Sequence, residues 1–102
     1  MFVNVIKSYR DTVAICDTEL LGKKFEQEFE GNIRQLDVKE NFYKGKETPE
    51  EEILEMLKAF SAEDATFNIV GEKSVQVALK AGIINEESVG RIQGIPFALV
   101  LI

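Results

Sequence analysis

The last part of the chain, residues 65–102, constrains the fold most strongly, because it holds the longest apolar run and the clearest breaks between elements. The apolar run is Ile95–Ile102, and it predicts a terminal strand over Pro96–Ile102. Because Phe97–Ile102 is apolar at every position, that strand is expected to be covered on both faces or to lie at a subunit contact. Pro96 has no backbone N–H to donate, so it is expected at the start of the strand or on a sheet edge.

The residues before this run alternate between strand and helix patterns. Ala65–Val70 is typical of a short strand, and Glu72–Ala81 has the apolar spacing of a helix. Gly82 is placed to end that helix in the left-handed conformation. Val89–Gln93 then predicts a further strand, followed by a turn at Gly94.

The first half of the chain is predicted to start with a β-hairpin over residues 2–16, followed by a short helical turn that begins at Asp17. Lys23–Gly31 alternates charge with two phenylalanines and fits either a ragged strand or a loop. Asn32–Lys39 predicts a strand, and Glu40–Glu47 predicts a connecting loop.

The clearest local signal is Thr48-Pro-Glu-Glu51. It predicts a helix over residues 49–60 with Thr48 as N-cap, Pro49 at the first helical position and Glu51 closing a capping box. On that basis, replacing Thr48 with alanine is expected to cost roughly 1 kcal/mol.

Together these elements predict one small α+β domain over residues 1–102. The expected architecture is a mixed, mostly antiparallel sheet of about five to six strands packed by two main helices. A chain of this length has room for a single core.

The cysteine and histidine content limits the available chemistry. Cys16 is the single cysteine and the chain has no histidine, so we expect no intramolecular disulfide, no structural zinc site within one chain and no bound metal. We also expect no cofactor. No apolar stretch approaches the roughly 20 residues of a membrane-spanning helix, and no secretory signal is visible. We therefore predict a cytoplasmic protein without a membrane partner.

The net charge of −6 arises entirely from residues 47–102, because residues 1–46 hold eight basic and eight acidic side chains. A uniformly acidic surface would repel nucleic acid. The neutral N-terminal half still offers a local basic face; the alternative is a solvated surface of lysine and glutamate. The lysines and arginine that would form that face are Lys23, Lys24, Arg34, Lys39, Lys44 and Lys46.

Gly71-Glu-Lys-Ser74 lies between a predicted strand and a predicted helix, where free backbone amides attract anions. A phosphate-binding loop needs an earlier glycine at the position of Thr66, so the pattern favours a simple strand-to-helix turn. Cys16 next to Asp17 lacks an evident base and is more typical of a small buried side chain.

Two groups of residues are candidates for ligand or partner binding, with no catalytic residue assigned. The first is Phe42, Tyr43 and Lys44, since aromatic rings stack on unpaired bases and lysine neutralises phosphate, although loop aromatics also anchor loops to a core. The second group flanks the apolar strands near the C-terminus and comprises Asn68, Gly71, Glu72, Lys73, Arg91 and Gly94. Arg91 is expected either to face outward or to pair with Glu72.

Four motifs extend over the whole chain. They are Cys16-Asp17-x-x-Leu20-Leu21-Gly22-Lys23, Phe42-Tyr43-x-Gly45, Asn68-Ile69-Val70-Gly71-Glu72 and Arg91-Ile92-x-Gly94-Ile95-Pro96. In these motifs the chain resembles the archaeal domain-of-unknown-function family 424, which has no established activity. The resemblance implies an association with translation, because genes of the family tend to lie near translation genes. Family members often carry a histidine after the last proline, where this chain has Phe97, so the resemblance does not support a catalytic histidine.

Three functions remain open from the sequence. The first is a non-enzymatic binding or assembly module that contacts RNA or a ribosome- or translation-associated protein. The second is a small enzyme in which Glu72 or Asp17 acts as acid or base and Arg91 holds an anionic ligand. The third is a structural homodimer formed through the C-terminal strand.

Overall fold

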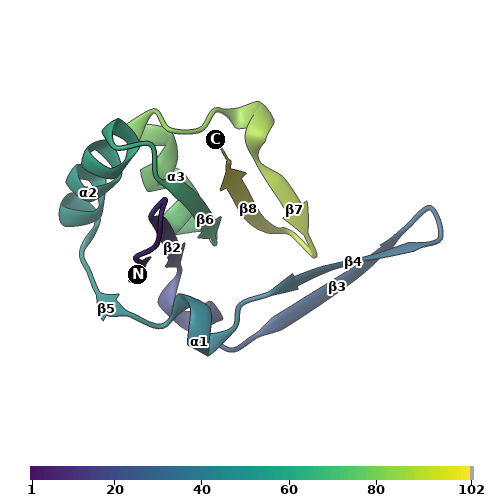
Figure 1. The fold of residues 1–102 in the computed structure, drawn as a ribbon. Helices are drawn as coiled ribbons and strands as arrows, with labels where there is room; N and C mark the ends of the chain where they lie inside the picture. Colours follow the sequence, from purple (N-terminus) through teal and green to yellow (C-terminus); the bar gives the residue numbers. More distant parts are fainter. Residues whose placement is uncertain (102) are drawn as a thin grey trace.

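The computed structural model describes residues 1–101 and shows a mixed six-stranded sheet with a separate two-stranded arm (Figure 1). Ile102, the last residue of the predicted terminal strand, lies outside the described residues. The elements in chain order are β1 (Phe2–Ile6), β2 (Thr12–Cys16), the 3₁₀ helix η1 (Thr18–Leu20), β3 (Lys24–Phe29), β4 (Asn32–Asp37), α1 (Glu40–Tyr43), β5 (Lys46–Glu47), α2 (Glu50–Ala62), β6 (Thr66–Val70), α3 (Glu72–Ala81), the 3₁₀ helix η2 (Glu86–Ser88), β7 (Gly90–Ile92) and β8 (Ile95–Val100).

The main sheet has the strand order β5-β1-β2-β6-β8-β7. Its pairs are antiparallel except β2 with β6, which run parallel in the register Ala14↔Asn68. A parallel pair needs a crossover connection, and here it contains the arm, α1, β5 and α2. The α+β class, the mixed and mostly antiparallel sheet and the two main helices are as the sequence predicts.

Hydrophobic side chains cover both faces of the sheet. One face packs against α2 and α3 through a cluster of buried residues that includes Val13, Ile15, Phe67, Ile69, Ile53 and Leu57. The opposite face carries Ala14, Cys16 and Val70, which pack against Leu20, Leu36, Val38 and Tyr43 from η1, from the base of the arm and from α1. Because side chains alternate along a strand, successive residues of β2 pack into the cores on opposite faces of the sheet.

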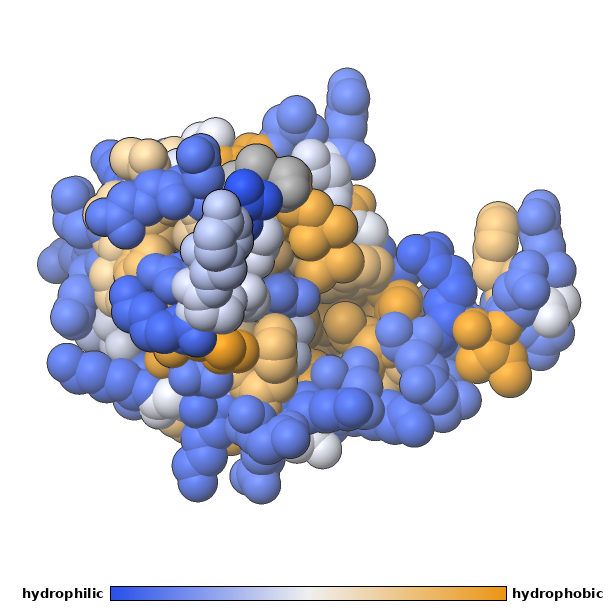
Figure 2. All heavy atoms as spheres, viewed as in Figure 1, coloured by the Kyte–Doolittle hydropathy of each residue, from blue (hydrophilic) through white to orange (hydrophobic). Residues whose placement is uncertain are grey.

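The arm consists of β3 and β4, joined by a two-residue turn at Glu30 and Gly31, both with positive φ. Only its base reaches a core, where Phe25 and Leu36 pack beneath the sheet. Figure 2 shows hydrophobic atoms gathered where the arm leaves the body, and mostly hydrophilic atoms along the arm itself. Residues 23–31, which by sequence fit either a ragged strand or a loop, thus contain the strand β3.

The start of α2 differs from the prediction. Pro49 is the N-cap, the helix begins at Glu50, and no side chain caps it. The backbone N–H of Thr48 donates to the Met1 carbonyl, so Thr48 prolongs the pairing of β5 with β1. Its buried hydroxyl then donates to the Lys46 carbonyl at 2.9 Å instead of accepting from the helix. The predicted capping box is therefore wrong, and the alanine effect argued from it loses its basis.

Residues 40–47 also differ from the predicted loop, because they form α1 and the short strand β5. The side-chain amide of Asn4 donates to the Phe42 carbonyl at 2.7 Å and fastens α1 across the sheet. Such a contact between residues far apart in the chain leaves no local pattern in the sequence.

The C-terminal strand is covered less completely than expected. Pro96 is its second residue and is buried, and its carbonyl accepts from the Gly71 N–H at 2.9 Å. Leu99 and Leu101, however, are 54% and 75% exposed, so the expected covering on both faces does not extend to these positions. A subunit contact through this strand stays a prediction.

Candidate functional site

Five of the nine predicted site residues line two open pockets. The α1–β6 pocket, of about 440 Å³, is lined by Asp37, Lys39, Asn41, Phe42, Tyr43 and Asn68. The α2–α3 pocket, of about 460 Å³, is lined by Met1, Glu50, Glu72, Lys73, Gln76 and Lys80. Asn68, Phe42 and Tyr43 thus come together, whereas Glu72 and Lys73 lie at a different place.

The turn at Gly71–Ser74 already holds an anion, namely the carboxylate of Asp17. Its Oδ1 accepts from the backbone N–H and the hydroxyl of Ser74, both at 2.8 Å, and its Oδ2 accepts from the Lys73 N–H at 3.1 Å. Asp17 is only 3% exposed. The N-terminus of α3 is therefore capped from β2, and its amides are not free for a phosphate.

This arrangement explains why glycine stands at position 71. Gly71 has φ +111°, and a Cβ added there would overlap the Asp17 carboxylate. The close approach of β6 to the end of β2 is fixed by a hydrogen bond from the Asp17 N–H to the Val70 carbonyl at 3.0 Å. This cap was not predicted from the sequence, although an acidic residue directly after a buried strand was the available signal.

Arg91 forms an ion pair with Glu72 at 3.0 Å and donates to the Gly94 carbonyl at 3.1 Å. Both side chains of the pair are more than half exposed, so its contribution to stability is small. Asp17, by contrast, is buried, and both its oxygens are occupied by the cap. An enzyme that uses Asp17 as acid or base would have to break this cap.

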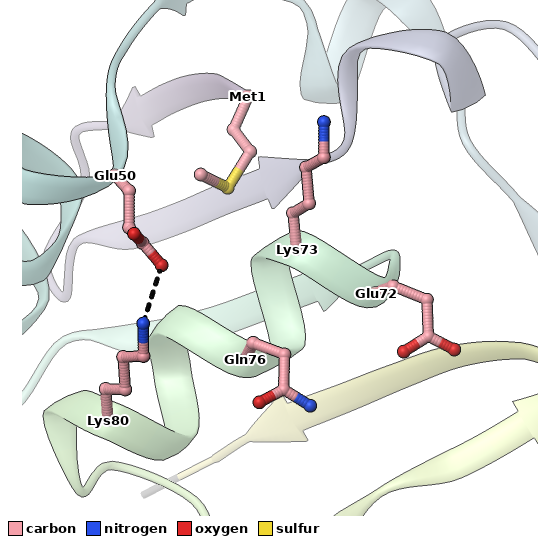
Figure 3. A pocket seen from close by; sticks show the side chains of 6 residues that line it. All are labelled: Met1, Glu50, Glu72, Lys73, Gln76 and Lys80. Atoms are coloured by element: carbon pink, nitrogen blue, oxygen red, sulfur yellow. Dashed lines mark hydrogen bonds and ion pairs between the residues drawn. The ribbon is translucent and has the colours of Figure 1, made fainter.

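Three of the four charged side chains of the α2–α3 pocket are paired, whereas the Lys73 ammonium and the Gln76 amide have no side-chain partner in residues 1–101. Lys80 pairs with Glu50 at 3.1 Å, and Glu72 pairs with Arg91 outside the pocket lining. Figure 3 shows the Glu50–Lys80 pair between α2 and α3, with Lys73 extended away from it. Exposed paired charges of this kind are common on protein surfaces and do not indicate a ligand.

In the α1–β6 pocket none of the polar side chains has a partner within residues 1–101. Neither a hydrogen bond nor an ion pair is made by the side chains of Asp37, Lys39, Asn41, Tyr43 or Asn68 in that part of the chain. The pocket contains a carboxylate, an ammonium, a phenol and two carboxamides, so it can both donate and accept hydrogen bonds.

Asn68 occupies an unusual position for this residue type. It lies in β6, which has a strand on each side, and its register partners are Ala14 and Leu99. Asparagine is depleted in strands, and here its half-buried amide opens into the pocket. The small side chain of Ala14 leaves room beside it. A polar residue at the centre of a sheet with no internal partner is a candidate ligand-binding residue.

Comparison with known proteins gives the family. A family model described as protein of unknown function (DUF424) matches residues 7–102. The chain belongs to the DUF424 family. A crystal structure of an uncharacterised conserved protein from Methanopyrus kandleri is similar, with 26% sequence identity and a TM-score of 0.79 over 97% of this chain and 88% of that one. No curated protein is significantly similar to this chain.

The two aromatic residues of the DUF424 chain differ in exposure. Tyr43 is buried, and burial is the main reason why its pKa rises to about 12, with smaller contributions from Cys16 and from the Asp37 carboxylate. Its ring meets that of Phe42 edge to face, with centroids 5.0 Å apart. Tyr43 therefore anchors α1 to the core and has no free face for a base, whereas the half-buried Phe42 keeps part of its ring at the pocket.

The other predicted residues take no part in the α1–β6 pocket. Lys44 is exposed just beyond α1. Gly71 is buried against Asp17, and Gly94 forms the β7–β8 turn with Gln93. Asp37, Lys39 and Asn41 were not among the predicted site residues, although all three lie within five residues of the predicted aromatic pair in the sequence. In residues 1–101, no three side chains of cysteine, aspartate or glutamate are placed to hold a metal ion, and no helix is long and apolar enough to cross a membrane.

Cys16 is fully buried, as the sequence predicts for a small core side chain. Burial, followed by the neighbouring Asp17 charge, raises its pKa from 9.0 to about 11. The contribution of this thiol to stability is therefore complete below pH 9.0 and is lost as the pH rises through about 11. We expect no alkylation of the folded protein by iodoacetamide at about pH 8, because thiolate is the reactive form.

Mass spectrometry of the alkylated protein checks this expectation. In denaturant the same treatment should add one label to each chain, since Cys16 is the single cysteine. Equal labelling rates in the folded and unfolded states would contradict the burial of Cys16.

Proposed function

We propose that this DUF424 protein is a non-enzymatic binding module that holds an unpaired base of an RNA in the α1–β6 pocket. The observation that carries the proposal is the set of side chains there without an internal partner: Asp37, Lys39, Asn41, Tyr43 and Asn68. No buried polar side-chain atom lacks a partner in the described chain, so the polar atoms of this pocket are open to water or to a ligand. The pocket volume of about 440 Å³ is also within the usual range for small-molecule sites.

The groups match the chemistry of an unpaired nucleotide. The Asn68 amide presents a donor and an acceptor side by side, as does the edge of a base. The accessible part of the Phe42 ring offers an apolar surface against which a base can stack. Lys39 supplies a positive charge at the rim for a phosphate.

The charge distribution favours this half of the molecule for RNA. All the pocket residues except Asn68 belong to residues 1–46, where basic and acidic side chains balance, and the excess negative charge lies elsewhere in the sequence. Lys39 and Lys44 are both exposed near the pocket and lack an ion pair in the described chain. The weak overall attraction to phosphate suits recognition of single unpaired bases better than non-specific duplex binding. A cytoplasmic role beside the translation apparatus is part of the proposal, as the family resemblance implies.

Fluorescence anisotropy with labelled single-stranded RNA at low salt tests the proposal. We expect Asn68→Ala and Phe42→Leu each to weaken binding roughly tenfold or more, since a base contact or a stacked base is lost. Lys39→Ala should weaken binding and lower the salt dependence by about one phosphate contact. Gln76→Ala, in the α2–α3 pocket, serves as the matched control and should leave the affinity unchanged.

Two results would oppose the proposal. The first is the absence of binding at low salt, where the electrostatic attraction is strongest. The second is binding that Asn68→Ala and Gln76→Ala weaken equally, because the pocket would then not be the contact surface. Circular dichroism of each variant separates lost binding from lost folding.

A further inference from the structure

The composition of the α1–β6 pocket also points to a particular base. Asp37 is acceptor-only when ionised, and it shares the lining of the pocket with two carboxamides that can donate. Among the four RNA bases, guanine alone presents two neighbouring donors, N1–H and the N2 amino group, beside a carbonyl acceptor, O6. We propose that the pocket selects guanine, with Asp37 accepting from N1–H and N2–H and the Asn68 amide donating to O6; this inference rests on the proposed function.

Asp37 is held rigidly enough for such a role. It is the last residue of β4 and pairs with Lys24 of β3. Directly after it, the Val38 N–H donates to the Lys23 carbonyl at 2.9 Å, and the Val38 carbonyl accepts from the Gly22 N–H at 2.7 Å. Because Leu36 and Val38 on either side of it are buried, the backbone that carries the carboxylate is fixed from both directions.

The carboxylate is also available. Asp37 is half-buried and makes no ion pair or side-chain hydrogen bond in the described part of the chain. It shares the lining of the pocket with Tyr43 and Asn68. A carboxylate that accepts two N–H bonds side by side forms a charge-assisted pair, which is stronger than a pair of neutral groups.

The other bases fit this acceptor poorly. Adenine and cytosine each place an unprotonated ring nitrogen next to the amino group, and that nitrogen would face a carboxylate oxygen. Uracil places a carbonyl on each side of its single N–H, so two oxygens would oppose the negative charge. These are unpaired or repulsive contacts, and they add discrimination against the other bases to the attraction for guanine.

The test compares RNA oligomers of uridine that differ only at one central nucleotide, which is guanosine, inosine, xanthosine, adenosine, cytidine or uridine. By fluorescence anisotropy at low salt, the wild-type protein should bind the guanosine oligomer roughly tenfold more tightly than the adenosine, cytidine and uridine oligomers. Inosine lacks the N2 amino group and should bind with intermediate affinity. Xanthosine has a carbonyl at that position and should bind poorly.

Asp37→Asn provides the sharper arm of the test. An amide at position 37 accepts from N1–H and donates to the C2 carbonyl, so the variant should lose its preference for guanosine and gain affinity for xanthosine. Glu28→Gln is the matched control, because it removes one negative charge from the exposed part of the same arm and should preserve the guanosine preference.

The outcomes are distinguishable. Equal binding of all oligomers, weakened by Asn68→Ala, would overturn the guanine selection and leave the proposed function standing. A preference for another base would also overturn it. Binding to none of the oligomers would remove the proposed function as well. If Asp37→Asn fails to fold, the comparison of guanosine, inosine and xanthosine on the wild-type protein decides the question.

Discussion

Replacing Asp17 with alanine is expected to lower the free energy of unfolding by about 3 kcal/mol, since the loss of a helix cap is combined with buried donors left without a partner. The carboxylate accepts from the backbone amides of Lys73 and Ser74 and from the Ser74 hydroxyl. Ser74 is fully buried, so no water replaces the lost acceptor without a rearrangement. The melting temperature should fall by roughly 15 °C in a domain of this size.

Thermal and urea unfolding followed by circular dichroism measure this change. Asp17→Asn keeps one acceptor oxygen for Ser74 and should cost less, about 1 kcal/mol. Glu19→Ala removes an exposed acidic residue of η1 and is the control, with little expected change. If Asp17→Ala unfolded at the same urea concentration as Glu19→Ala, the buried cap would not contribute to stability.

Replacing Gly71 with alanine is expected to lower the free energy of unfolding by about 4 kcal/mol, because backbone strain and steric overlap act together. Its φ of +111° disfavours any side chain, and the added Cβ would overlap Asp17. Gly82→Ala is a matched control, since Gly82 has φ +75° but open space around the Cβ position. The control should therefore cost only about 1 kcal/mol, from conformation alone.

A double-mutant cycle isolates the overlap. In the Asp17→Ala background the steric part of the Gly71→Ala effect disappears, so the second substitution should cost about 2 kcal/mol, from backbone strain alone. Strict additivity of the two substitutions would show that Gly71 and Asp17 do not oppose each other in the folded protein.

Elements defined by local patterns were predictable from the sequence. α3 covers Glu72–Ala81 as predicted, because its apolar spacing and the glycine on either side define both of its ends. The hairpin of β1 and β2 was predictable because both strands are rich in β-branched residues and a short polar break separates them. The arm was ambiguous because most of β3 is exposed, and without burial on one face its sequence has no reason to alternate regularly.

The start of α2 shows how a tertiary contact overrides a local signal. Thr48-Pro-Glu-Glu51 fits a capping box, but the pairing of β5 with β1 continues to Thr48 and holds its backbone in the strand direction. The helix then begins one residue later than predicted, at Glu50. Because the partner strand β1 lies far earlier in the chain, a local sequence pattern cannot reveal this pairing.

The candidate site was predictable only in part. Asn68, Phe42 and Tyr43 were identified by residue type, but the pocket exists because Asn4 fastens α1 across the sheet. Asp37 had a usable signal, since it is a charged residue between the apolar residues Leu36 and Val38. Its convergence with Asn68 depends on the crossover between β2 and β6, which residue types and spacing do not reveal.

The central claim is that the α1–β6 pocket is the surface that binds RNA. Titration of the ¹⁵N-labelled protein with the guanosine-containing oligomer, followed by NMR, tests it most directly. We expect the side-chain amide signals of Asn68 and Asn41 and the backbone signals of residues 37–43 to shift together and saturate, whereas those of the α2–α3 pocket stay in place. Shifts confined to α2 and α3, or none at saturating RNA, would contradict it.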